Sequence, residues 1–178
     1  MVSVVCHGAL NRAVKEFNLT SPAKILDKAT ELVIETFEKS NSNIKDGMDI
    51  ALCSFSKNSN ELEYAGANNS IYLIRSGELS EYKSDKQPVG KHVNNKPFTN
   101  QQIKLEKTDS LYLFTDGYSD QFGGPKGKKY KYRAFKQLLI DVHQKAMKDQ
   151  KAIIKKSFID WQGNLEQIDD VCIVGIKV

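Results

Sequence analysis

Apolar residues recur with a helical period near the start of the chain and with a period of two through its middle. Residues 2–17 and 22–37 carry apolar side chains three and four positions apart, which predicts two amphipathic helices. The second is the better marked, because Ser21 can cap it and Pro22 suits the first helical position. From Gly47 to Leu113 apolar and polar residues alternate between turn signals, so this stretch is predicted to form antiparallel strands. Among these signals are a turn at residues 57–60 and a tight reversal at Asn68-Asn69, because asparagine tolerates a positive φ.

A second helical region follows a loop that is rich in glycine and lysine and reaches about Tyr130. Two helices are predicted over about 132–147 and 149–162, and an apolar strand over 171–178 closes the chain. Because nearly every residue of 171–176 is apolar, we expect this strand in the centre of a sheet, covered on both faces. Helices, then antiparallel strands, then helices and a returning strand predict an α+β layered fold.

Composition narrows the class of protein without choosing a function. The chain has 178 residues, which suits one domain, and 40% hydrophobic with 27% charged residues excludes a disordered protein. A net charge of +4 is too small to indicate nucleic-acid binding by itself. The sequence contains no apolar run long enough to span a membrane, and its first residues lack the cationic segment of a secretory signal.

Cysteine usage argues against a zinc cluster or a disulfide framework. Cys6, Cys53 and Cys172 are odd in number and far apart, and no Cys-x-x-Cys pair occurs. We therefore expect free thiols, as in a reducing cytoplasm.

Two acidic positions are candidates for chemistry. Asp116 ends an apolar strand and precedes Gly117, which permits a sharp turn and leaves room for an ion; an Asx-turn or a strand-end cap is the alternative. Asp169 and Asp170 precede the last strand, where a cation would relieve their repulsion; a solvated turn is the alternative. Oxygen donors without a Cys or His cluster suit Mg²⁺ or Mn²⁺ rather than Zn²⁺.

Five short segments extend this pattern along the chain, each weak alone but specific as an ordered set. They are Asp46–Leu52, Tyr64–Asn69, Gln87–Gly90, Leu113–Gly124 and Gln167–Val171. In order and spacing the set resembles the SpoIIE-type bacterial branch of the metal-dependent protein serine/threonine phosphatases, the protein phosphatase 2C (PP2C) superfamily. The resemblance implies a PP2C-like α-β-β-α sandwich of antiparallel sheets flanked by helices, here lacking its first strands.

The resemblance also implies a site that holds two Mn²⁺ or Mg²⁺ ions, which activate a water for attack on a phosphoester. On this reading Asp116 and Asp169 are metal ligands, and Gly117 is the backbone next to the metal. Asp120 would bind a third, weaker metal, for which Asn68 replaces another family ligand. No separate catalytic side chain is assigned.

The family's two earlier metal motifs have no counterpart in this sequence. Cys6-His7-Gly8 is similar to part of an Asp-x-x-Gly-His-Gly turn, but Val5 stands where the aspartate would be, and His7 is equally an ordinary helix residue. We therefore expect residues 1–178 to be a single partial phosphatase domain, truncated at its N-terminus, with a partial or absent metal complement. Little or no activity of the chain alone and self-association through an uncovered sheet edge are further expectations.

The implied substrate is a phosphoserine or phosphothreonine protein of bacterial signalling, with a phosphorylated anti-sigma-factor antagonist as the leading candidate. An N-terminal sensor region in the full-length protein and a cytoplasmic location are also implied, without nucleic acid or membrane. Residues 123–133 carry five cations and two tyrosines, which fits a solvated loop, phosphoprotein docking or single-stranded nucleic acid. A non-catalytic, phosphatase-like interaction module is the alternative function.

Overall fold

A computed structural model describes residues 2–39, 46–56 and 59–178. The sequence also predicts a polar loop over 39–43, after the second helix; its residues 40–43, and residues 57–58 of the turn predicted at 57–60, lie outside the described residues. The chain divides into two compact units, one of Met1–Ser70 with Tyr82–Leu105 and one of Ile71–Glu81 with Glu106–Val178. Within the described residues no helix is both long and apolar enough to cross a membrane.

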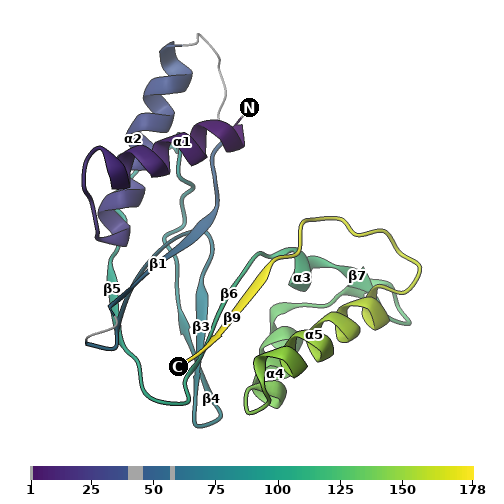
Figure 1. Cartoon of the computed structure of the whole chain (residues 1–178). Coiled ribbons are helices and arrows are strands. Elements are labelled where there is room, and N and C mark those ends of the chain that lie inside the picture. The colour runs from purple at the N-terminus through teal and green to yellow at the C-terminus, as the bar shows by residue number, and fades with distance from the viewer. Residues whose placement is uncertain (1, 40–45, 57–58) are drawn as a thin grey trace. The chain divides into compact units, whose positions relative to one another are not determined.

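The first unit combines two helices with an antiparallel sheet (Figure 1). Its elements are α1 (Val2–Lys15), α2 (Pro22–Lys39), β1 (Ile50–Ser56), β2 (Glu61–Ala67) and β5 (Gln101–Lys104). The sheet order is β1-β2-β5, with Ile50 opposite Ala67 and Tyr64 opposite Gln101. As predicted, α2 begins at Pro22, directly after Ser21.

The second unit contains the other sheet and three further helices. Its strands are β3 (Ile71–Arg75), β4 (Glu78–Tyr82, whose last residue belongs to the first unit), β6 (Ser110–Phe114) and β9 (Ile173–Lys177), in the order β4-β3-β6-β9. The helices are α3 (Gly117–Asp120), α4 (Tyr132–Val142) and α5 (Met147–Gln162). A short hairpin, β7 (Phe122–Gly123) with β8 (Lys128–Lys129), replaces part of the expected loop.

The predicted α+β class with antiparallel sheets is confirmed, but the place of the last strand is not as predicted. Among the described residues β9 is the outermost strand of its sheet and pairs on one side only, antiparallel to β6 (Figure 1). The expectation of a central strand was therefore wrong for the described residues. The reason is that an apolar composition indicates how much of a strand can be buried, but not how many strands pair with it.

Candidate metal centre

The ends of β6 and β9 bring the two predicted acidic positions to one corner of the second unit. β6 runs into Thr115-Asp116-Gly117, while Asp169 and Asp170 lead toward β9. The pairing of Phe114 with Ile173 continues past both strands, because the Thr115 N–H donates to the Cys172 carbonyl at 3.0 Å. Two stretches more than fifty residues apart in sequence are thereby held side by side.

The side-chain hydroxyl of Thr115 also joins the two segments at this corner. Its Oγ1 donates to the Asp170 carbonyl at 2.7 Å and accepts the Cys172 N–H at 3.0 Å. One hydroxyl therefore satisfies a backbone acceptor and a backbone donor on the opposite segment. The position of the acidic doublet depends on this side chain as well as on the strand ladder.

Gly117 permits the close approach of the two segments. A Cβ atom at this position would lie 2.5 Å from the Asp170 carbonyl oxygen and 3.3 Å from Cγ2 of Val171. The nearer atom belongs to the backbone and cannot rotate away. The glycine expected beside a metal thus has a measurable steric reason to be there.

Asp116 occupies the position before the short helix α3. Its backbone oxygen accepts the Asp120 N–H and the Ser119 hydroxyl, both at 2.9 Å, while its side chain makes no capping hydrogen bond. The side chain is exposed. The carboxylate of Asp116 therefore does not cap α3.

Asp169 and Asp120 have local partners. Oδ1 of Asp169 accepts the N–H of Asp170 at 2.7 Å, a contact that shapes the turn before β9. Oδ2 of Asp120 lies 2.8 Å from Nζ of Lys129, in an ion pair that is more than a third exposed on both sides. A metal at Asp120 would have to displace this lysine.

Asn68, which stands in place of a family ligand for the third metal, belongs to the first unit. It adopts a positive φ of 56°, as the predicted Asn68-Asn69 reversal requires. Its side-chain amide donates to Oδ1 of Asp49 at 2.8 Å, a contact that the sequence did not indicate.

The most buried carboxylate of the second unit is structural, and sequence reasoning missed it. Asp109 is 1% exposed and receives both Nε and Nη2 of Arg75, at 2.9 and 2.7 Å, together with the Glu106 N–H. Burial acts to raise the pKa of Asp109, but these hydrogen bonds and the charge of Arg75 outweigh it, so the pKa is lowered. Its only sequence signal, an acid beside Ser110, is too common to predict a partner 34 residues away.

Two of the three cysteines do not compete with oxygen as metal donors. All three are free, and burial raises the pKa of the Cys53 thiol to about 12 and that of Cys6 above its ordinary value. These two thiols are therefore protonated at neutral pH and supply no thiolate. Cys172 contributes its backbone to the corner, as described above.

A hard divalent cation fits the donor chemistry of this corner in part. Asp116 and Asp169 are exposed carboxylates on adjoining segments, and Mg²⁺ is commonly bound by one or two carboxylates with water completing the shell. Among residues 2–39, 46–56 and 59–178, however, no group of three or more His, Cys, Asp or Glu side chains could hold a metal. The described residues thus supply part of a site.

Solved structures define the class of fold. The SiaA-PP2C domain of Pseudomonas aeruginosa matches with a TM-score of 0.89 at 24% identity, over 99% of this chain and 69% of that one. The phosphatase domain of SpoIIE from Bacillus subtilis, presoaked with Mn, matches with a TM-score of 0.62 at 10% identity. The match covers 97% of this chain and 73% of that one. A longer structure, the SpoIIE phosphatase domain with a fragment of the regulatory domain, matches with a TM-score of 0.73 at 12% identity. The match covers 99% of this chain and 49% of that one. The expected PP2C-like fold is confirmed.

The family follows from the sequence as a whole. Residues 1–178 match the family described as Stage II sporulation protein E (SpoIIE). The chain therefore belongs to the SpoIIE family of PP2C-type phosphatases, as the ordered motifs predicted. No curated protein matches it significantly.

Proposed function

We propose that residues 1–178 form part of a metal-dependent phosphatase domain that hydrolyses phosphoserine or phosphothreonine in a regulatory protein of bacterial signalling. The observation that carries the proposal is the corner at which Thr115 joins Asp116 to the Asp169-Asp170 doublet. In this proposal the carboxylates of Asp116 and Asp169 bind Mn²⁺ or Mg²⁺, and Asp120 is a weaker additional ligand. The free cysteines agree with a cytoplasmic location.

Each residue of the corner has a separate task in this proposal. A bound divalent ion supplies charge stabilisation for the phosphoryl oxygens and lowers the pKa of a bound water. Gly117 leaves room for the backbone of Asp170, and Thr115 fixes the position of the Asp169-Asp170 doublet. The side chain of Asp116 does not cap α3. Lys129 holds Asp120 until a cation replaces it.

The phosphoprotein partner is supported by unpaired basic residues near Asp120. Within the described chain Lys126, Lys128 and Arg133 have no ion pair, whereas Lys129 is committed to Asp120. Arginine and lysine bind phosphate through charge-assisted hydrogen bonds, so this segment is a candidate for gripping a phosphorylated segment. A phosphorylated anti-sigma-factor antagonist is the first substrate to test.

The metal assignment is tested by Mn²⁺ binding, followed through the loss of free-ion electron paramagnetic resonance signal. Asp116→Asn and Asp169→Asn should each weaken binding by about tenfold or more, because each removes one charged donor. Asp141→Asn is the control, since Asp141 is exposed and accepts a hydrogen bond from Gln137 on its own helix. Equal affinities for all four proteins would refute the site.

The chain by itself should hydrolyse p-nitrophenyl phosphate slowly or not at all in Mn²⁺. The reason is the partial donor set of the described residues, among which no group of three or more His, Cys, Asp or Glu side chains could hold a metal. The same observation favours the alternative, a phosphatase-like interaction module. Fast turnover that Asp116→Asn abolishes would overturn the expectation of low activity and exclude the module.

A further inference from the structure

A fully buried glutamine lies just beyond the carboxylate corner. Gln121 directly follows α3 and is 0% exposed. Its side-chain amide Nε2 donates to two backbone carbonyls, that of Phe122 at 3.0 Å and that of Glu166 at 2.8 Å. Glu166 is 45 residues further along the chain and comes shortly before the acidic doublet. One side chain therefore joins the end of α3 to the segment that carries Asp169.

The backbone of Gln121 is itself held in place. Its carbonyl accepts the indole N–H of Trp161 at 3.1 Å and the backbone N–H of Tyr130 at 3.0 Å. The next residues pack closely against the end of α5, because the Gly124 N–H donates to the Trp161 carbonyl at 2.7 Å and a Cβ at Gly123 would overlap that same oxygen. Gln121 is thus a fixed base from which its side chain holds another segment.

The hydrogen bonds of this amide show which of its atoms contribute. Oε1 of Gln121 is buried and has no hydrogen-bond partner among the described residues. Leaving a buried acceptor unpaired is unfavourable, so the contribution of this side chain lies in its two donors. The bond to Phe122 joins neighbouring residues, whereas the bond to Glu166 reaches a separate segment. The distant bond is therefore the one that fixes a position elsewhere in the second unit.

The segment that Gln121 holds has an irregular backbone. Residues 163–170, which connect α5 to β9, are all described and form neither a helix nor a strand. Thr115 holds the far end of this connection through the Asp170 carbonyl, and Gln121 holds it at Glu166. Asp169 lies between these two points. Because the connection lacks a regular backbone ladder, its conformation depends on such side-chain contacts.

The stretch that carries Asp116 thereby fixes both ends of the stretch that carries Asp169. Thr115 comes directly before Asp116, and Gln121 comes directly after the helix that Asp116 precedes. Ligands that are held in place beforehand lose less conformational freedom when an ion binds. Outer contacts that orient metal ligands accordingly change affinity by about 10–100-fold.

We propose that Gln121 is a positioning residue of the metal site. By holding the Glu166 carbonyl, it keeps Asp169 in place to share an ion with Asp116. This inference rests on the proposed function, in which both carboxylates are metal ligands. In this role Gln121 contacts neither metal nor substrate and acts through the backbone of residues 166–169.

Backbone order in the metal-free chain tests the proposal without any substitution. Nitrogen-15 relaxation of the 178-residue chain should give order parameters of about 0.8 or more at Gln167, Ile168 and Asp169, as in rigid backbone. Values below about 0.6, the flexible range, would overturn the proposal, because Gln121 would then not hold the segment. This measurement decides the question even where a substitution at the buried site prevents folding.

Replacement of the amide tests its effect on the metal. Gln121→Met nearly preserves the length of the side chain but removes both donors, so Mn²⁺ binding should weaken by about tenfold. Loss of the free-ion electron paramagnetic resonance signal measures the affinity. The order parameters of residues 167–169 should fall in the metal-free variant. Emission of Trp161, the single tryptophan of the chain, should keep its wavelength, because its indole bonds to the unaltered backbone of residue 121.

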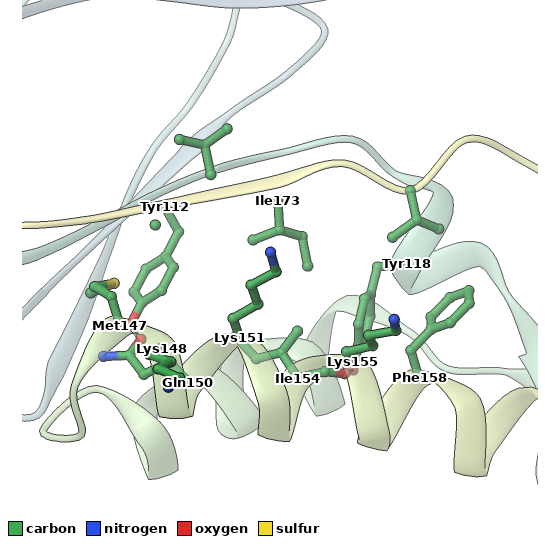
Figure 2. Close-up of a pocket in the computed structure, with 13 residues that line it drawn as sticks. Tyr112, Tyr118, Met147, Lys148, Gln150, Lys151, Ile154, Lys155, Phe158 and Ile173 are labelled. Carbon is green, nitrogen blue, oxygen red and sulfur yellow. Dashed lines mark hydrogen bonds between the residues drawn. The ribbon is translucent and has the colours of Figure 1, made fainter.

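Gln150→Met is the matched control, because Gln150 is 1% exposed and also bridges two carbonyls. Its Nε2 donates to His143 at 3.1 Å and to Lys145 at 2.8 Å. Figure 2 shows it beside Tyr112, whose hydroxyl donates to its Oε1 at 2.7 Å. These partners belong to β6 and to the connection between α4 and α5. Gln150→Met should lower the free energy of unfolding at least as much as Gln121→Met but leave Mn²⁺ affinity unaltered.

Mn²⁺ affinity also separates this proposal from the metal site on which it rests. If Asp116→Asn and Asp169→Asn weaken binding while Gln121→Met binds as the unaltered chain does, the role of Gln121 is refuted and the site stands. If neither aspartate variant changes the affinity, the site is refuted and the role of Gln121 with it. Equal weakening in Gln121→Met and Gln150→Met would overturn the proposal too, because the loss then follows from reduced stability alone.

Discussion

The two units of the chain build their cores from different side chains. In the first unit the buried cluster is rich in alanine, including Ala9, Ala23 and Ala29, and is completed by aliphatic residues and a few rings. In the second unit aromatic rings dominate, and Phe135 contacts the rings of Tyr72, Phe114 and Tyr118 at centroid distances of 4.7–6.4 Å. Small residues let helices approach closely, whereas rings fill a wider space.

The difference teaches where chemistry can be placed. The first unit joins β1 to β2, strands that are close in sequence. The second joins β6 to β9 across the whole of α4 and α5, and the carboxylate corner adjoins that returning strand. Distant segments meeting at a strand end bring together side chains that no local motif could.

Truncation of the aromatic core should have the largest effect. Phe135→Ala is expected to lower the free energy of unfolding by about 4 kcal/mol, because a fully buried ring leaves a cavity. Denaturant unfolding followed by circular dichroism measures it. The control, Phe55→Ala in the first unit, removes a ring that is 48% exposed and should cost about 1 kcal/mol or less. A loss for Phe135→Ala as small as that of the control would contradict the contrast.

Asp109→Asn should lower the free energy of unfolding by about 2 kcal/mol at pH 7, since it removes the charged half of a buried pair. The pKa of Asp109 is lowered on folding, so its contribution is complete above the ordinary value near 3.8 and is lost as pH falls through the folded pKa. The gap between variant and unaltered chain should therefore shrink on acidification below that value. A gap independent of pH would argue against the ion pair.

Gly117→Ala should weaken Mn²⁺ binding by about tenfold, or ~1.4 kcal/mol, because the new methyl group collides with the Asp170 backbone. Spin-resonance titration measures the change. Unaltered affinity would show that the close approach of the two segments is not needed for the site.

A glycine-to-alanine substitution in the first unit should stabilise the fold, and this effect should be the smallest of those predicted here. Gly8 lies inside α1, and a Cβ there would meet nothing within 4 Å. Gly8→Ala is therefore expected to stabilise the chain by about 0.5–1 kcal/mol through helix propensity. Thermal unfolding measures it, and destabilisation would mean that α1 is packed more tightly than described.

Local signals in the sequence predicted local structure well. The start of α2 followed from Ser21 and Pro22, and the reversal at Asn68 followed from the tolerance of asparagine for positive φ. The hairpin of β7 and β8 was missed, because each strand has only two residues, Phe122–Gly123 and Lys128–Lys129, which is too short to show an alternating pattern. The outermost place of β9 was missed because pairing partners are set by the whole sheet.

The candidate site was predicted mainly through resemblance. A bare Thr-Asp-Gly and an Asp-Asp doublet are both ambiguous, and only the ordered set of motifs related Asp116 to Asp169. The Arg75–Asp109 pair shows the limit of such reasoning, since 34 residues separate the partners and no motif joins them. Contacts of this range depend on the packed fold rather than on local pattern.

The hydroxyl of Thr115 has a consequence for the order of folding. Its partner Asp170 is 55 residues away, so the bond forms only after a long loop has closed, and such contacts are slow because chain entropy is lost before they stabilise anything. The carboxylate corner should accordingly mature late, after the helices between its two segments. The time at which metal affinity appears during refolding would then report when the second unit is completely folded.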